Sequence, residues 1–339
     1  MPIINHQRVQ LSHGSGGRMS AELIDKLFLP RFGNPILNRL EDQATLDIGP
    51  GRLAFTTDSF VVDPIFFPGG DIGDLAINGT VNDIAVSGAK PLFLSAAFIL
   101  EEGLPMLDLH RILVSMEIAA KNAGVVIVTG DTKVVNIGSC DKIFINTTGI
   151  GMIPEGTMIS AASLKPGDAI IVSGTLGDHG MAIMTSRKGL SFQSRILSDT
   201  APLNHLVDAM LAVSKNIHAL RDPTRGGVAA TLNEWAKASN LGIVIDEEKI
   251  PVREEVRAAC EILGIDPLYV ANEGKLVAAV PEEWAERIIS SMKSHPQGKN
   301  SAIIGRVVED HRGMVTIRTA LRVERIVDMP LGEQLPRIC

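Results

Sequence analysis

The chain has 339 residues, of which 45% are hydrophobic and 21% are charged, and its formal net charge is −7. These values are typical of a folded protein with one large or two medium domains, and they exclude a disordered chain. The sequence has no Lys/Arg-rich stripe and no run of about 18 apolar residues, so neither nucleic acid nor a membrane is expected as a partner. Three cysteines without paired spacing, and the lack of a cationic, apolar leader, indicate the reducing cytoplasm.

The first half of the chain alternates between strand-like and helix-like segments after a glycine-rich start. Residues 1–40 contain HGSGGRMSAELIDKLF, and an N-terminal domain is expected at residues 41–155. Strands are predicted in RLAFTTD, PLFLSAAFIL, VVIVTGD and KIFINTTGIGMI. Helices are predicted in DIGDLAINGTVNDIAVSGA, which closes at Gly88, and in PMLDLHRILVSMEIAAKNAG, which ends with Gly124 as its cap.

The second half, expected at residues 165–320, follows the turn KPGD and has a similar order of elements. Strands are predicted in AIIVSG, GIVIDEE, KLVAAVP and SAIIGRVVE. Helices are predicted after TLGDHG, in RDPTRGGVAATLNEWAKASN after its opening loop, and in PEEWAERIISSMKS. Residues 321–339 show no helix or strand period and are expected to form a flexible tail. The sequence therefore predicts a two-domain α/β (α+β) subunit with a C-terminal tail.

Five aspartates lie among small residues where predicted strands end or helices begin. They are Asp42, Asp58, Asp83, Asp131 and Asp222. Mg²⁺ prefers carboxylate and phosphate oxygens, and small neighbours allow backbone N–H groups to approach an anion. For any one aspartate alone, a helix cap or a turn is the simpler interpretation. The hypothesis of a metal and phosphate site therefore rests on the set of five.

The glycine-rich segment HGSGG, from His13 to Gly17, lacks the Lys-Ser/Thr pair of a P-loop. It is therefore either a flexible connector or a cover over phosphates. His13 alone is more typical of a surface or cap residue than of a ligand. The segment TLGDHG also lacks the spacing of a dinucleotide fingerprint, so neither segment identifies a nucleotide site by itself.

Six segments spread over the chain together resemble the HypE family of hydrogenase maturation factors. They are HGSGGRMSAELI, TTDSFVVDPIFFPGGDIGDLAINGTVNDIAVSGAKPL, VTGDTKVV, RDPTRGGVAATLNE, ANEGKLVAAV and the terminal PRIC. The second segment alone resembles the wider superfamily of aminoimidazole ribonucleotide synthetase, selenophosphate synthetase and thiamine-phosphate kinase, whereas PRIC makes the resemblance specific. The resemblance implies a subunit that forms a homodimer through its N-terminal domains and binds ATP near that interface.

The resemblance also implies a reaction. Cys339 would receive a carbamoyl group from the carbamoyltransferase HypF, and ATP-dependent dehydration would convert this group to a thiocyanate. The cyano group would then pass to iron on the HypC–HypD complex, for nickel–iron hydrogenase. A tail of about 20 residues spans up to roughly 65 Å when extended, so Cys339 could visit each site in turn. Glu273 is expected to act as general base, and Lys133 either to stabilise charge on the carbamoyl oxygen or to help position the base, although in isolation they would be an ordinary solvated pair.

ATP and Mg²⁺ are the ligands that the resemblance implies. The expected metal ligands are Asp42, Asp58, Asp83, Asp131 and Asp222, and the expected nucleotide contacts are His13, Gly14, Ser15, Gly16, Gly17, Asp58, Asn78, Asp83 and Asp131. Two alternatives stay open. One is a superfamily enzyme that acts on a small soluble substrate, such as a selenophosphate synthetase or thiamine-phosphate kinase. The other is a non-enzymatic protein that uses PRIC as a docking peptide.

Overall fold

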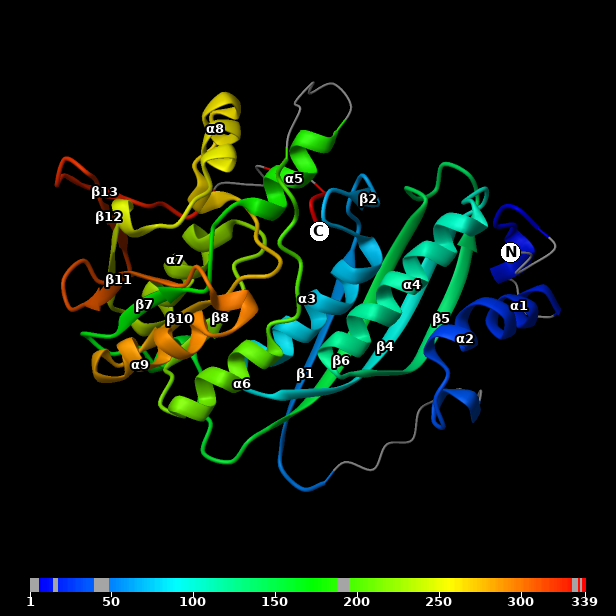
Figure 1. The fold of residues 1–339 in the computed structure, drawn as a ribbon, viewed down its shortest axis with the longest axis horizontal. Helices are drawn as coiled ribbons and strands as arrows, with labels where there is room; N and C mark the ends of the chain where they lie inside the picture. Colours follow the sequence, from blue (N-terminus) through cyan, green and yellow to red (C-terminus); the bar gives the residue numbers. More distant parts are fainter. Residues whose placement is uncertain (1–5, 15–17, 40–48, 188–194, 331–334, 336) are drawn as a thin grey trace.

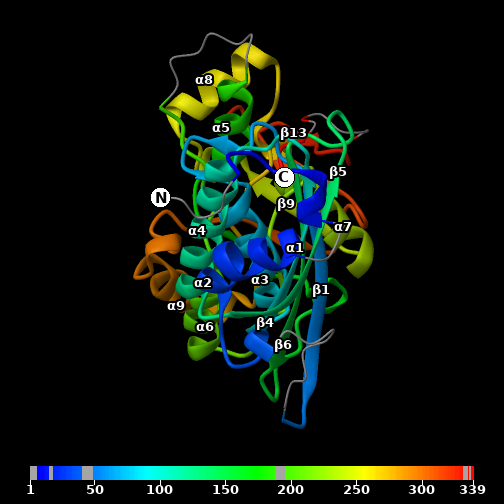
Figure 2. The same cartoon turned by 90° about the vertical axis from the view of Figure 1, so that its right-hand side faces the viewer.

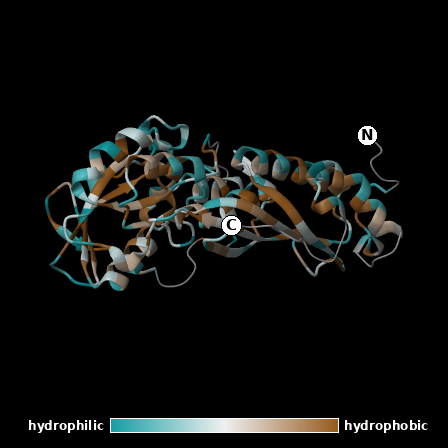
Figure 3. Cartoon of the chain, turned by 90° about the horizontal axis from the view of Figure 1, so that it is seen from below, coloured by the Kyte–Doolittle hydropathy of each residue, from teal (hydrophilic) through white to brown (hydrophobic). Residues whose placement is uncertain are grey.

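The computed structural model describes residues 6–14, 18–39, 49–187, 195–330, 335 and 337–339. It has two lobes side by side, and the C-terminal residue lies between them in both Figure 1 and Figure 3. In the described part of the chain, no helix is long and apolar enough to cross a membrane.

The N-terminal lobe is a four-stranded sheet with two long helices on one side (Figure 2). The strand order is β1-β6-β4-β5, in which β1 and β4 run antiparallel to β6, and β4 runs parallel to β5. Its elements are η1 Leu11–Gly14, α1 Arg18–Leu23, η2 Ile24–Phe28, α2 Leu29–Phe32, η3 Leu37–Arg39, β1 Arg52–Phe60, β2 Phe66–Phe67, β3 Gly70–Asp71, α3 Ile72–Val86, β4 Lys90–Glu101, α4 Met106–Ala123, β5 Val126–Val135 and β6 Ile143–Ile153.

Helices α3 and α4 begin and end where local chemistry favours it. Asp71 caps α3 by accepting hydrogen bonds from the backbone N–H groups of Gly73 and Asp74, while the Asp74 side chain accepts one from Asp71 N. Gly124 ends α4 in the left-handed region at φ 71°, which a glycine adopts without steric cost. The predicted helices and the cap at Gly124 are confirmed.

One face of the N-terminal sheet carries exposed apolar side chains. Along β1 the side chains alternate, and Thr56 faces α3, where it bonds to Asp83. Phe55 therefore faces the other side, where it is 73% exposed, and Leu53 shares that face. Ile99 of β4 is also exposed there. We call this side of the sheet the open face.

The C-terminal lobe is built on a seven-stranded sheet with the order β13-β12-β9-β11-β7-β10-β8. Its elements are η4 Ala161–Ser163, β7 Ala169–Val172, α5 Asp178–Ser186, α6 Asn204–Val213, β8 Ala219–Arg221, α7 Gly227–Ser239, β9 Gly242–Asp246, η5 Glu247–Lys249, α8 Glu254–Leu263, η6 Pro267–Tyr269, β10 Val277–Val280, α9 Glu282–Lys293, η7 Pro296–Gly298, β11 Ala302–Val308, β12 Val315–Arg318 and β13 Glu324–Ile326.

Helices cover both faces of this sheet, which explains the continuous apolar runs of its central strands. All residues of β7 and β10 are buried. On one face, alternate residues of these strands pack with α7, including Trp235. On the other face, they pack with α6 and α9 and also with Ala85 of α3, which belongs to the N-terminal lobe. Figure 3 shows the brown, hydrophobic strands inside this lobe.

The expectation that residues 321–339 lack regular structure is wrong in part. Strand β13 pairs antiparallel with β12 at the edge of the C-terminal sheet. Near the end of the chain, Leu335 and Ile338 are buried in a hydrophobic cluster to which both lobes contribute. A strand of three exposed residues shows no hydrophobic alternation, so the sequence pattern could not indicate it. Helix α8 was also not predicted.

Candidate active site

Four carboxyl groups, contributed by both lobes, lie close enough together that their charges affect one another's pKa values. They are Asp58 on β1, Asp83 on α3, Asp222 after β8 and Glu273 before β10, and we call them the carboxylate cluster. Burial, and then the charge of Asp83, raises the pKa of Asp222 to about 7. Burial, and then the charge of Asp222, raises the pKa of Glu273 well above its usual value, with Asp58 and Asp83 adding to the effect. The cluster therefore favours the neutral acids until a cation compensates its charge.

The N-terminal half of the cluster is held by the close approach of α3 to β1. An added Cβ at Gly79 would come within 2.9 Å of the Phe60 ring, so only glycine allows this approach. Asp83 on α3 then accepts a hydrogen bond of 2.7 Å from the Thr56 hydroxyl of β1. Asp58 accepts one of 2.8 Å from the backbone N–H of Ser59. Both carboxyl groups keep free lone pairs for a ligand.

Glu273 is held by backbone contacts that leave its carboxyl group free. Its carbonyl accepts a hydrogen bond of 2.9 Å from the Asn82 side chain of α3, and its N–H donates one of 3.2 Å to Asp199. Burial would raise the pKa of Asp199, but the Lys275 ammonium at 2.9 Å, together with His179 and the backbone N–H of Glu273, holds this pKa below its usual value. An ionised Asp199 thus fixes the backbone of Glu273 within the C-terminal lobe, and Asn82 links it to the N-terminal lobe.

Two buried acceptor atoms, one in the cluster and one on α3, fit a bound cation or a ligand donor. Glu273 Oε1 and Asn78 Oδ1 have no hydrogen-bond partner among the described residues, and such atoms are costly unless a ligand satisfies them. Within the described ranges, no three His, Cys, Asp or Glu side chains are already grouped as a metal site. A magnesium ion here would therefore take part of its ligands from phosphate oxygens and water, as Mg²⁺ usually does.

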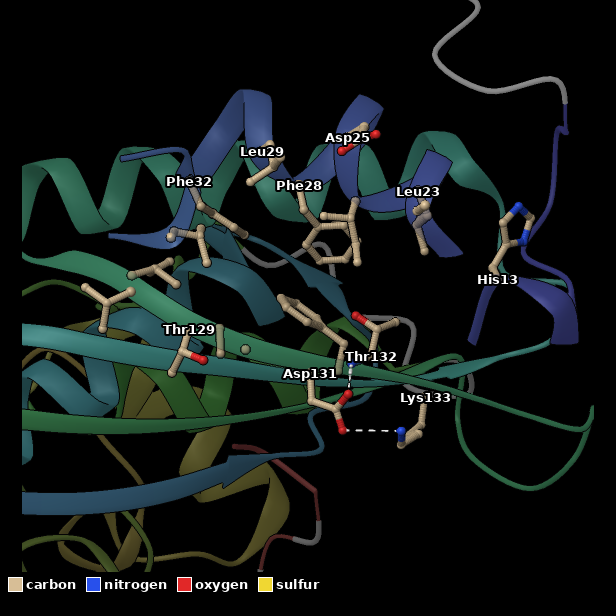
Figure 4. A pocket seen from close by; sticks show the side chains of 18 of the residues that line it. His13, Leu23, Asp25, Phe28, Leu29, Phe32, Thr129, Asp131, Thr132 and Lys133 are labelled. Atoms are coloured by element: carbon tan, nitrogen blue, oxygen red, sulfur yellow. Dashed lines mark hydrogen bonds and ion pairs between the residues drawn. The ribbon is translucent and has the colours of Figure 1, made fainter. Parts of the chain in front are cut away.

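The structure does not bring Asp131 and Lys133 to this cluster. Both lie on β5, at the opposite edge of the sheet from β1, which corresponds to about 14 Å across three strand spacings. Their β4 partners are Ala97 and Ile99, so both side chains lie on the open face. They form an exposed ion pair of 3.6 Å and point away from the helices above the sheet (Figure 4). Asp131 and Lys133 therefore could not fill their predicted roles at the carboxylate cluster of the same chain.

The glycine-rich segment is described only at its start. His13 lies in the turn η1, is buried, and accepts a hydrogen bond of 2.9 Å from Gln10 N. It lines a cavity of about 540 Å³ between β5 and the helical segment from α1 to α2, together with Phe28 and Phe98 (Figure 4). Gly14 closes η1. Three of the predicted phosphate contacts and one predicted metal ligand lie outside the described residues: Ser15, Gly16, Gly17 and Asp42.

The end of the chain is docked between the lobes. Val61 N donates a hydrogen bond of 3.2 Å to the Cys339 carbonyl, and Asp63 N donates one of 3.1 Å to the Arg337 carbonyl. Arg337–Cys339, which we call the docked tail, therefore runs antiparallel to the segment that directly follows β1. An ion pair of 2.8 Å joins Arg337 to Asp141, and Cys339 is half-buried.

Several residues that complete this region were missed by the sequence interpretation. His179 bonds to the docked tail, Asn82 bonds to Glu273, and Asp199 pairs with Lys275. The only signal for His179 was the segment TLGDHG, which was considered as a dinucleotide motif and set aside. Asn82 lies one residue before Asp83, but its side chain points to the other lobe, where it donates to the carbonyl oxygens of Ala201 and Glu273.

Two family models match the chain, one for each lobe. The family described as AIR synthase related protein, N-terminal domain, matches residues 40–153, and its C-terminal domain matches residues 165–318.

Full-length relatives agree with these matches. The carbamoyl dehydratase HypE of Azotobacter vinelandii is 54% identical over 331 residues, which cover 98% of this chain and 97% of that protein. The solved structure of hydrogenase maturation protein HypE in complex with ATP has a TM-score of 0.93 and 53% identity, and covers 97% of this chain and 99% of that chain. A chain of the HypE–HypF complex has a TM-score of 0.80 and 54% identity, with 91% and 99% covered.

Proposed function

Because this chain belongs to the HypE family of carbamoyl dehydratases, as its motifs predicted, we propose that it dehydrates a carbamoyl group on its own Cys339. The product would be a thiocyanate that supplies the cyanide ligand for the iron of nickel–iron hydrogenase. ATP would drive the reaction, and Mg²⁺ would be its counterion. A cytoplasmic location stays a prediction.

The position of the docked tail is the observation that carries this proposal. The tail pairs with Val61 and Asp63, and Val61 is three residues beyond Asp58 of the carboxylate cluster. The reactive residue of the chain is therefore hydrogen-bonded to the segment that continues from a predicted phosphate-site carboxylate, Asp58. A soluble substrate would need no such arrangement, because it would diffuse to the cluster without a tether. Tethering instead raises the local concentration of the substrate to about millimolar.

The chemistry needs a better leaving group than oxide. Transfer of the γ-phosphoryl group of ATP to the carbamoyl oxygen makes that oxygen part of phosphate, and the loss of two N–H protons then leaves S–C≡N with release of phosphate. Mg²⁺ held at the carboxylate cluster would neutralise the triphosphate, since positioning and charge neutralisation dominate phosphoryl transfer. Once Mg²⁺ compensates the charge of the cluster, an ionised Glu273 would be suited to take a proton, because burial raises the pKa of its carboxyl group.

The open face supports the proposed homodimer. Leu53, Phe55 and Ile99 would be covered if a second copy packed against this face, whereas they are exposed in one chain. Such pairing would also explain Asp131 and Lys133, which lie on this face and too far from their own cluster. In a dimer they could act at the cluster of the neighbouring subunit.

Two partners follow from the family. HypF would load Cys339 with the carbamoyl group, consistent with the solved HypE–HypF complex of a relative, and the HypC–HypD complex would accept the cyano group. Both steps require the docked tail to leave its place between the lobes. The tail is therefore proposed to alternate between docked and free positions.

The test is the intact mass of the protein after incubation with HypF, carbamoyl phosphate and ATP. A gain of one carbamoyl group followed by the loss of one water is expected, and Cys339→Ser should show neither change. Loss of water from the Ser variant, or turnover of a soluble substrate by a chain that lacks Cys339, would contradict the proposal.

A further inference from the structure

A fully buried histidine, His179 on α5, touches the docked tail. Its Nε2 lies 2.6 Å from the Ile338 carbonyl oxygen, and its Nδ1 lies 2.8 Å from the Ser198 hydroxyl. The edge of the ring also packs against Phe67, with 5.6 Å between ring centroids. Both ring nitrogens are thus engaged, one with the tail and one with the C-terminal lobe.

The protonation state of this ring follows from its partners. A carbonyl oxygen only accepts, so the Nε2 atom of His179 carries the hydrogen and donates it to Ile338. Burial lowers the pKa of His179, so the ring is neutral near pH 7. Nδ1 is then an acceptor, and the Ser198 hydroxyl donates to it. The contact to the tail therefore has a fixed direction.

The same run of hydrogen bonds continues to α3. The backbone N–H of Thr200 donates to Ser198 Oγ at 3.2 Å, and the Asn78 side chain donates to the Thr200 hydroxyl at 3.1 Å. Asn78 Oδ1 is the buried acceptor that has no partner among the described residues. The docked tail is thus connected, through side chains of the C-terminal lobe, to a predicted nucleotide contact.

We infer that His179 is a positioning residue that sets the register of the docked tail by holding the carbonyl that immediately precedes Cys339. This inference deepens the proposed function and rests on it. The bond from His179 to Ile338 and the bond from Val61 to Cys339 lie on either side of the reactive residue, so together they fix its Cα. A backbone carbonyl is present whatever group the sulfur carries. The contact can therefore hold the thiol, carbamoyl and cyano forms in the same place.

Two substitutions separate the tail contact from the rest of the ring. In His179→Gln the amide nitrogen reaches about as far as Nε2 and can still donate to Ile338. In His179→Asn the shorter side chain reaches only toward Ser198. As a matched control, His205→Asn removes an exposed imidazole of α6 whose Nε2 lies 3.0 Å from the Asn122 carbonyl.

The first readout is the rate at which iodoacetamide alkylates Cys339, followed by mass spectrometry of the C-terminal peptide. Since docking half-buries this residue, the rate follows the undocked population. The loss of one buried hydrogen bond predicts that alkylation is about five- to tenfold faster in His179→Asn. In His179→Gln and in His205→Asn, the rate should change by less than about twofold. Equal rates in His179→Asn and the unchanged protein would overturn the inference.

The second readout is the unfolding midpoint in a double-mutant cycle with a chain that ends at residue 336. His179→Asn should lower the midpoint less in the shortened chain, because the partner carbonyl is already absent. An equal loss in both chains would show that His179 only supports its own lobe, and would overturn the inference. Neither readout involves catalysis. A protein that shows both effects and forms no thiocyanate would therefore refute the proposed function and not the role of His179.

Discussion

The charge of Asp222 is predicted to destabilise the ligand-free protein as pH rises, so Asp222→Asn should stabilise it most at alkaline pH. Asp222 is 8% exposed, and it lies in the field of Asp83 and Asp58. In the unfolded chain, Asp222 is neither buried nor close to Asp83 and Asp58, so it has the ordinary pKa of 3.8. An asparagine of the same shape carries no charge and removes this conflict.

The magnitude follows from the two pKa values. Burial and the neighbouring carboxylates raise the folded-state pKa of Asp222 to about 7, which is about three pH units above the unfolded value, and each unit corresponds to about 1.4 kcal/mol. Because the folded-state value is the higher one, the stabilising effect of the bound proton is complete below about pH 4 and is lost as pH rises to about 7. The loss is about 4 kcal/mol at pH 8 and about 1.5 kcal/mol at pH 5. Asp222→Asn should thus stabilise the protein by about 2–3 kcal/mol more at pH 8 than at pH 5.

The assay is urea unfolding of both proteins at pH 5 and pH 8, without nucleotide or divalent metal, with the midpoint and slope compared. As a control, Asp208→Asn on the exposed side of α6 should change the free energy of unfolding by less than about 0.5 kcal/mol. Mg²⁺ with ATP should stabilise the unchanged protein more at pH 8, since metal binding needs ionised carboxylates. If Asp222→Asn raised the free energy of unfolding equally at both pH values, the pKa of Asp222 would not be raised by burial and by the neighbouring carboxylates, and the reasoning would be refuted.

Three further substitutions test separate parts of the structure. Glu273→Gln should slow single-turnover conversion of the carbamoylated protein by about 10²-fold or more, measured by quenched-flow mass spectrometry; an unchanged rate would remove Glu273 from the mechanism. Gly274→Ala should lower the free energy of unfolding by about 1–3 kcal/mol in thermal denaturation, because an added Cβ overlaps the Asp199 carbonyl oxygen; a stable, unshifted variant would contradict this packing. Phe55→Asp should yield monomers in sedimentation velocity, and a dimer of unchanged affinity would show that the open face is not the interface.

The elements of the fold could largely be predicted from the sequence, because their signals are local. The continuous apolar run of β7 and the glycine cap of α4 were interpreted correctly, as was the alternation of strands and helices in both halves. These features depend on residues within one turn or one strand of each other. Strand β13 had no such signal, since it is short and exposed and is defined only by its partner β12.

The residue types of the site were also indicated by the sequence, but their grouping was not. Asp58, Asp83, Asp222 and Glu273 were singled out from their small neighbours and from the family resemblance. Asp131 and Lys133 have the same kind of surroundings in the sequence, yet β5 places them on the open face at the far edge of the sheet. Strand order and side-chain alternation decide this difference, and neither can be obtained from one strand alone.

The sequence by itself determined the periodic elements, the family and the presence of a terminal cysteine. Only the tertiary structure decided that Cys339 is docked, that His179 holds the carbonyl before it, and that Asp199 fixes the backbone of Glu273. His179 and Ile338 are separated by 159 positions in the chain, and Glu273 and Asp199 by 74. Such contacts depend on how segments far apart in the chain pack together, whereas hydrophobic periodicity specifies only which side of each element is buried.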